Sequence, residues 1–177
     1  MGMGANAGAV LRGGAVGMAV FMLAAILPDA TYEAVFCALP ARFAAMYFGT
    51  VADGASFALA DGRVIAVTRV CGGSGFFAML CGLLVCRGMC CTRFAGGVAA
   101  AWVYTVLVNG VRVVGAVWIR AFAEVLLPER MWAMAHLAAG VFVFFPALCL
   151  FWWGAVGFPV PIGLKEEDMY GKSNTNA

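Results

Sequence analysis

Charged residues are scarce in this chain. Lysine, arginine, aspartate and glutamate make up 11% of its 177 residues, whereas 64% are hydrophobic and the mean hydropathy is +0.96. A water-soluble globule needs more polar side chains than this to cover its surface, so the composition predicts an integral membrane protein. The basic residues are scattered and the formal net charge is only +2, which argues against nucleic-acid binding.

Other chemistry-bearing patterns are also missing. The chain has no Cys-x-x-Cys pair, which counts against a thiol redox protein that would use Cys71 with Cys81. The cluster of Cys86, Cys90 and Cys91 has no histidine nearby, and two adjacent cysteines are poor chelators, so we expect no metal and no other cofactor. The seven cysteines are an odd number, and most lie in apolar runs, where reduced thiols are the norm.

Four apolar stretches predict membrane-spanning helices. They cover about residues 10–27, 75–85, 94–108 and 135–156. A short glycine-rich lead, residues 1–14, begins the chain, and no small-residue cleavage site follows the first stretch, so we expect an uncleaved helix there. We predict an all-α membrane protein, a multi-span helical bundle whose single transmembrane domain occupies residues 1–164. Residues 165–177 form a polar tail that we expect on the cytoplasmic side.

Two further apolar stretches are short or carry charges. Residues 34–48 are interrupted by Pro40 and Arg42, and residues 113–131 contain two arginines and two glutamates. Either stretch crosses the membrane or lies in its interface, and the charges favour the interface. The prediction is therefore four spans with one or two interfacial or short helices, and the orientation of the N-terminus is left open.

A β-hairpin is predicted at about residues 56–69. Two extended-looking runs, residues 56–60 and 63–69, flank Asp61-Gly62, which is a strong signal for a tight hairpin turn. Because open strand edges are not tolerated in hydrocarbon, we expect this hairpin outside the bilayer, on the extracytoplasmic side. It would bring Cys71 to the membrane boundary.

Cys71 is the predicted nucleophile. It is followed by Gly72 and Gly73, where the hairpin runs into an apolar helix that we expect to begin near Gly75. The N-terminus of such a helix favours a thiolate, because its dipole and its free N–H groups point back at the sulfur. The glycines allow a substrate carbonyl to come close and leave backbone N–H groups available to an oxyanion.

Three polar residues later in the chain complete the candidate site. Asn109 and Arg112 are three positions apart, so they share a helix face, and the predicted topology returns them to the side that holds Cys71. His136, the only histidine, opens the last span on that side. Cysteine and histidine are the usual nucleophile and base of acyl transfer, and an arginine supplies positive charge where the oxyanion forms.

Asn109 would then orient Arg112 or His136. Two alternatives stay open. Arg112 could instead pair with Glu124, or Arg112 and His136 could line a polar cavity in a non-enzymatic membrane protein, such as an assembly factor or a transporter subunit.

The three motifs, in this order, resemble the exosortase/archaeosortase family of membrane cysteine transpeptidases. They are Cys71-Gly72-Gly73, then the Asn-x-x-Arg motif that begins at Asn109, and then His136 at the start of a helix. The Phe76-Phe77 pair and the small size look most similar to the exosortase K branch. Where that family commonly has Ser or Ala after its cysteine, this chain has Gly72.

The resemblance implies a function and its partners. The protein would be a multi-pass protein of the plasma (inner) membrane whose catalytic residues, Cys71, Arg112 and His136, face the extracytoplasmic side. Its substrate would be a membrane-anchored protein with a C-terminal sorting signal, cleaved through a thioester on Cys71. An amine on a lipid or glycan would accept the acyl group, and membrane lipids would surround the enzyme. If water took the place of the amine, the enzyme would be a simple protease.

Overall fold

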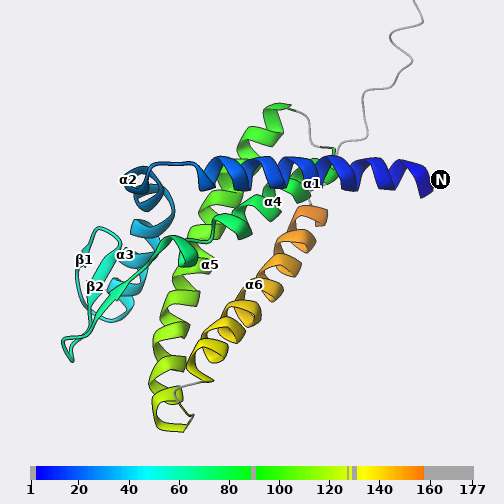
Figure 1. Ribbon diagram of the computed structural model, residues 1–177. Coiled ribbons are helices and arrows are strands. Elements are labelled where there is room, and N and C mark those ends of the chain that lie inside the picture. Colours follow the sequence, from blue (N-terminus) through cyan, green and yellow to red (C-terminus); the bar gives the residue numbers. More distant parts are fainter. Residues whose placement is uncertain (1–2, 89–90, 127, 129–130, 158–177) are drawn as a thin grey trace, which may run out of the picture.

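The computed structural model describes residues 3–88, 91–126, 128 and 131–157. It consists mainly of helices, with one small sheet at the side (Figure 1). Three helical segments in this part of the chain are long and apolar enough to cross a membrane, namely Ala7–Ala25, Arg69–Cys86 and Arg93–Leu126. The last helix has a shorter apolar stretch, Gly140–Gly154, so three of the four predicted spans have the required length.

Helices α1 (Met3–Ala25) and α4 (Ser74–Cys86) lie side by side (Figure 1). They approach closely because glycines face each other. A Cβ atom added to Gly13 would lie 2.6 Å from the carbonyl oxygen of Gly82, and one added to Gly82 would lie 2.7 Å from that of Gly13. Such small residues allow close packing of membrane helices. The predicted glycine-rich lead, residues 1–14, is therefore helical from Met3 and takes part in this packing.

The second helix pair is antiparallel. Helix α5 runs from Cys91 to Leu126, and α6 runs back beside it from Trp132 to Gly157 (Figure 1). The hydroxyl of Tyr104 on α5 donates a hydrogen bond to the carbonyl oxygen of Ala147 on α6 over 2.8 Å. This contact fixes the register of the two helices near their middle.

Helix α5 continues through the point where the sequence predicted a break. Its 36 residues correspond to about 54 Å. The expectation of a separate interfacial helix over residues 113–131 is therefore wrong for residues 113–126, because they continue α5. Gly110 does not end the helix; it makes room for Phe43, whose Cδ1 atom would lie 2.5 Å from an added Cβ. The charged side chains of Arg120 and Glu124 pair with each other one turn apart, over 2.9 Å.

A bent helical connection links α1 to the sheet. It consists of α2 (Asp29–Tyr32), a π-helical turn η1 (Glu33–Cys37) and α3 (Ala38–Tyr47), which follow one another without a gap. Pro40 has no N–H to donate within this continuous segment, and the carbonyl oxygen of Val35, five residues before it, accepts a hydrogen bond from Trp102 Nε1 over 3.3 Å. Residues 34–47 are helical, as a π-helical turn followed by α3, and their place at the membrane interface stays a prediction.

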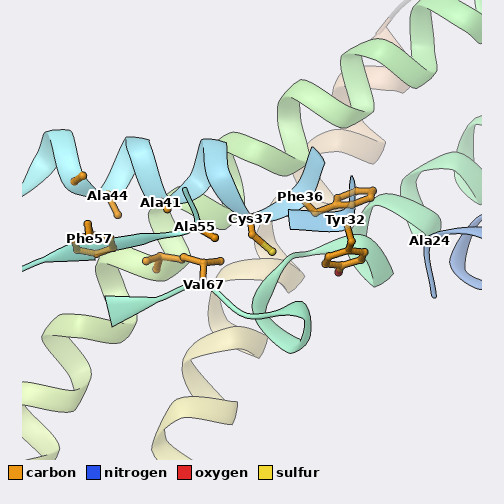
Figure 2. Packing of buried hydrophobic residues seen from close by; sticks show 11 residues of the cluster. Ala24, Tyr32, Phe36, Cys37, Ala41, Ala44, Ala55, Phe57 and Val67 are labelled. Carbon is orange, nitrogen blue, oxygen red and sulfur yellow. The ribbon is translucent and has the colours of Figure 1, made fainter. Parts of the chain in front are cut away.

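The buried face of α3 packs on the sheet. Ala41 and Ala44 are fully buried there, opposite Phe57 and Val67 (Figure 2). On the other side, α3 contacts α5. The helix is therefore enclosed by protein on two sides, and this packing accounts for its buried alanines, whereas Met46 and Tyr47 are exposed.

The predicted hairpin is confirmed, and it belongs to a three-stranded antiparallel sheet. Its strands, in the order β1-β2-β3, are Ala52–Asp53, Ser56–Ala58 and Val64–Ala66. In the turn, Gly62 has a φ of 82°. The Asp61 carboxylate accepts hydrogen bonds from the backbone and side chain of Arg63, which hold the pKa of Asp61 below its usual value. The first strand, β1, was not predicted.

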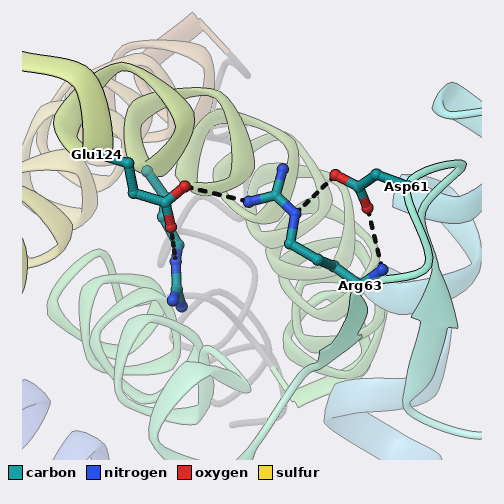
Figure 3. Close-up of polar contacts among 4 residues, drawn as sticks. Asp61, Arg63 and Glu124 are labelled. Atoms are coloured by element: carbon teal, nitrogen blue, oxygen red, sulfur yellow. Dashed lines mark hydrogen bonds and ion pairs between the residues drawn. The ribbon is translucent and has the colours of Figure 1, made fainter.

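The turn is also tied to α5. The Arg63 guanidinium lies 2.7 Å from Asp61 and 3.3 Å from the carboxylate of Glu124 (Figure 3). The second oxygen of Glu124 accepts a hydrogen bond from Arg120. Such exposed ion pairs contribute little energy one by one, but together they hold the tip of the hairpin against the helix.

The glycine contact between α1 and α4 leads to a stability prediction. Gly13→Leu should lower the free energy of unfolding by about 1–3 kcal/mol, because its side chain would push into the backbone of α4. Gly14→Leu is the matched control, since nothing lies within 4 Å of a Cβ atom at Gly14. Thermal unfolding in detergent micelles would measure both variants, and equal midpoints would contradict the packing described here.

Candidate functional site

Cys71 lies at the junction between the sheet and α4. It is the last residue of a short 3-10 helix, η2 (Arg69–Cys71), and α4 begins at Ser74, one residue earlier than predicted. Gly73 caps α4 with a φ of 80°, in the left-handed region that favours glycine. A Cβ atom on Gly73 would also lie 3.4 Å from Cγ of Asn109. The glycine motif therefore lets α5 approach the loop that carries the thiol.

Tyr32 supports this loop from the other side. A Cβ atom added to Gly72 would lie 2.7 Å from the Tyr32 hydroxyl oxygen, so only glycine fits there. The Tyr32 hydroxyl donates to the carbonyl oxygen of Arg69 over 3.0 Å and is hydrogen-bonded to Ser74 Oγ at 2.9 Å. Sequence reasoning missed Tyr32, and no local pattern around it signals this role.

Arg69 completes the support. Its guanidinium lies over the Tyr32 ring, 4.5 Å from the ring centroid, and forms a 3.0 Å ion pair with Asp29. It also donates hydrogen bonds to the carbonyl oxygens of Ala25 and Leu27, at the C-terminal end of α1. The end of α1 and the loop before Cys71 are thus joined through one side chain.

Two of the predicted site residues contact Cys71 directly. The side-chain amide of Asn109 donates a hydrogen bond to the backbone carbonyl of Cys71 over 2.7 Å, and Nη1 of Arg112 donates to the same oxygen over 3.3 Å. Asn109 is fully buried. The structure therefore brings together the first two motifs, although 38 positions separate Cys71 from Asn109.

Arg112 is a buried cation without a carboxylate partner among the described residues. Its side chain is 9% exposed, and Nε has no hydrogen-bond partner there. The alternative in which Arg112 pairs with Glu124 is wrong, because Glu124 binds Arg63 and Arg120. A buried positive charge without a counter-charge is unfavourable, so this arrangement favours an anion beside the guanidinium.

Helix α6 packs against Arg112. The guanidinium carbon lies 5.2 Å from the centroid of the Phe144 ring, and an added Cβ at Gly140 would lie 3.3 Å from Arg112 Nε. Glycine at position 140 therefore leaves room for the guanidinium between the two helices.

The third predicted residue, His136, belongs to α6, but its side chain lies outside the described part of the structure. Its backbone position can be related to the site. Residue 136 is one helical turn before Gly140, so both occupy the same side of α6. Because α5 and α6 are antiparallel and Gly140 lies beside Arg112, residue 136 is at the level of Ala116 on α5.

A cavity of about 220 Å³ opens beside Cys71 and Arg112. The other lining residues come from β3 with the residue after it and from the second half of α5, and most are apolar. A second cavity, of about 360 Å³, lies between Arg112 and apolar residues of α4 and α6 such as Met79 and Phe144. Arg112 thus borders both cavities, and the half-buried thiol of Cys71 belongs to the first.

Cys37 is a second thiol near the site that sequence reasoning missed. Its side chain is only 2% exposed. Burial raises the pKa of Cys37 to about 11, and the charges of Glu33 and Cys71 add to the rise. The redox alternative named Cys81, which is buried within α4. A negative charge on Cys71 raises the pKa of Cys37, and burial keeps the Cys37 thiol protonated.

No cluster of three potential metal ligands occurs among the described residues, which do not include the side chains at positions 90 and 91. Comparison with family models, curated proteins and solved structures finds no match to this chain. The site itself consists of a thiol, a buried guanidinium and a buried amide in a helical membrane protein.

The two neighbouring thiols should differ in reactivity. At pH 8, iodoacetamide should alkylate Cys71 at least 10-fold faster than Cys37, because burial raises the pKa of Cys37 to about 11 and restricts access to its thiol. Mass spectrometry of digested protein would give both rates. Unfolding in SDS, as a control, should make the rates similar. Equal rates in the folded protein would contradict the geometry.

Proposed function

We propose that this protein is a membrane-embedded cysteine protease or transpeptidase that cleaves the C-terminal sorting signals of exported proteins. The observation that supports it most strongly is the placement of Arg112, a buried cation without a carboxylate partner among the described residues, against the loop of Cys71. The motifs resemble the exosortase/archaeosortase family, whose substrates are of this kind. The physical argument supports acyl transfer, and the substrate follows from the resemblance alone.

In the first step, the thiolate of Cys71 attacks the carbonyl carbon of the scissile peptide bond. The carbonyl oxygen becomes an oxyanion, which is stabilised by the guanidinium of Arg112 and by the backbone N–H of Gly73, since the N–H of Gly72 donates to the Arg69 carbonyl. Nη1 of Arg112 donates to the Cys71 carbonyl, and the guanidinium has further N–H donors that can bind an oxyanion. His136 gives a proton to the leaving amine as the carbon–nitrogen bond breaks, which leaves a thioester on the sulfur.

In the second step, a new nucleophile attacks the thioester. His136, now neutral, removes the proton from an amine of a lipid or glycan acceptor, and the carbon–sulfur bond breaks to restore the thiolate. If water replaces the amine, the product is a free carboxylate and the enzyme acts as a protease. Asn109 is a positioning residue in both steps, because it holds the backbone of Cys71 rather than the reacting atoms.

The length of α5 up to Arg112 supports a site at a membrane surface, although α4, with 13 residues, corresponds to only about 20 Å. The distance along α5 from Cys91 to Arg112 is about 32 Å, which matches the roughly 30 Å of hydrocarbon in a bilayer. If Arg87 and Arg93 lie on the cytoplasmic side, Cys71 and Arg112 reach the extracytoplasmic side of the inner membrane. In this proposal α6 is the fourth span, and the polar tail at residues 165–177, which lies outside the described residues, is cytoplasmic.

Substitutions in the three proposed catalytic residues should abolish processing. Cys71→Ser, Arg112→Ala and His136→Ala should each lower cleavage of a tagged sorting-signal substrate at least 100-fold, as expected when a nucleophile, an oxyanion donor or a base is lost. Immunoblotting of cells that express enzyme and substrate together would measure cleavage. All three variants should remain in the membrane fraction.

Suitable controls are available in the same chain. Cys37→Ala and Cys149→Ala should process the substrate at the normal rate, because one thiol is buried and the other lies far along α6. Arg112→Lys should recover only part of the activity, since lysine restores charge without the planar set of donors. Normal processing by Cys71→Ser would disprove the proposed function.

A further inference from the structure

Strand β3 has an open edge. Two hydrogen bonds show which residues of β3 bond to β2. The N–H of Leu59 donates to the carbonyl oxygen of Arg63, and the N–H of Val67 donates to that of Ala55, both over 2.8 Å. Since hydrogen-bonded pairs alternate along an antiparallel ladder, Ile65 faces β2 and its neighbours Val64 and Ala66 direct their N–H and C=O groups outward. Among the described strands, β3 pairs only with β2. An open edge of this kind accepts another strand.

The cavity beside Cys71 runs along this edge. It is lined by four consecutive residues, Val64, Ile65, Ala66 and Val67. Side chains of a strand alternate between two faces, so a cavity that touches four residues in a row must lie beside the backbone. The opposite wall is α5, through residues one turn apart such as Val113, Ala116 and Val117.

The dimensions and lining of this cavity favour aliphatic side chains. Its volume of about 220 Å³ is below the roughly 300–1,000 Å³ of sites for drug-sized ligands. The wall on α5 is small and aliphatic at Val113, Ala116 and Val117. One or two side chains of valine or leucine size fit such a space, and a cofactor does not.

Both ends of the groove are defined. At one end lie Cys71 and Arg112, the residues of the proposed catalytic site. At the other end lies Arg120, which also lines the cavity. Arg120 pairs with Glu124, and Glu124 binds Arg63 of the hairpin, which keeps the strand and the helix at a fixed separation (Figure 3). A chain that enters this groove in an extended conformation is therefore guided to the sulfur.

We propose that the substrate segment N-terminal to the scissile bond binds as an additional strand on the edge of β3, with an aliphatic side chain in the cavity. The inference rests on the proposed function and adds the mode of recognition. The membrane helix of a sorting signal follows the scissile bond, so the residues before that bond extend away from the bilayer along the hairpin. They run toward Cys71, as β3 does, and the added strand is parallel to β3.

The exposed backbone groups favour a peptide over a lipid. An acyl chain in the groove would cover the outward N–H and C=O groups of Val64 and Ala66 without satisfying them, which is costly. A peptide satisfies them with its own backbone. Arg112 at the end of the groove then meets the carbonyl that Cys71 attacks.

The experiment uses peptidyl chloromethyl ketones on the purified full-length protein in detergent micelles. The thiolate of Cys71 displaces chloride from the reagent, so a carbon–sulfur bond forms and chloride leaves. Acetyl-Ala-Leu-Val-chloromethyl ketone should label Cys71 at least 10-fold faster than acetyl-Asp-Lys-Asp-chloromethyl ketone, and iodoacetamide gives the intrinsic reactivity of the thiol. Mass spectrometry would identify the labelled cysteine and give each rate.

N-methylation tests the strand pairing. Two further reagents carry an N-methyl group on leucine or on valine, which leaves the side chains unchanged. Because N–H groups of a strand point alternately to its two sides, only one of these reagents should react at least 10-fold more slowly. A uniform effect, or none, would overturn the added-strand proposal.

Substitutions test the cavity. Ala116→Phe should slow the Ala-Leu-Val reagent at least 10-fold and leave the iodoacetamide rate within threefold, because it fills the groove without touching the thiol. Ala100→Phe, at an exposed position of the same helix, is the control and should change neither rate.

The remaining outcomes separate the two proposals. If iodoacetamide labels Cys71 and the peptide reagents show no preference, strand addition fails and the proposed function stands. If a decanoyl chloromethyl ketone reacts with Cys71 as fast as the Ala-Leu-Val reagent, the groove holds an acyl chain. If the rate at which Cys71 is labelled falls as the protein concentration rises, a second copy of the chain occupies the groove. Either result overturns the peptide proposal. If no reagent labels Cys71, both proposals fail.

Discussion

The architecture depends on one backbone carbonyl, that of Cys71, which accepts hydrogen bonds from Asn109 and Arg112. Both donors come from the middle of α5, and both are buried, so neither can exchange this partner for water without disturbing the packing around it. The loop between the sheet and α4 is thereby held against α5. In the same contact a guanidinium is brought to the residue that carries the thiol, and both residues line one cavity, which is the basis of the proposed chemistry.

The support around this contact comes from parts of the chain that carry no reactive group. Arg69 joins the end of α1 to the loop, and Tyr32 packs on Gly72 and bonds to Ser74. Helix α1 in turn is fixed on α4 by facing glycines. The N-terminal helix is therefore a structural part of the site, although it lies far from Arg112 in the sequence.

Local signals were sufficient for most of the helices, for the hairpin and for part of the site. The Asp61-Gly62 turn gave the hairpin, and the three-residue spacing of Asn109 and Arg112 gave their common face, because both follow from backbone periodicity. The continuity of α5 through Gly110 could not be predicted, since it depends on Phe43 from another helix. The pairing of Glu124 with Arg63 likewise depends on where the hairpin tip lies, which no local pattern encodes.

The π-helical turn at Glu33–Cys37 has a consequence for insertions and deletions in this region. A π turn contains one residue more than an α turn, and one residue corresponds to a rotation of about 100° around the helix axis. Tyr32 before the turn faces the loop of Cys71, and Ala41 after it faces the sheet. Loss of a single amino acid here would bring the two halves into ordinary helical phase and turn the phenol ring away from the loop, so the length of this segment is constrained more tightly than its composition.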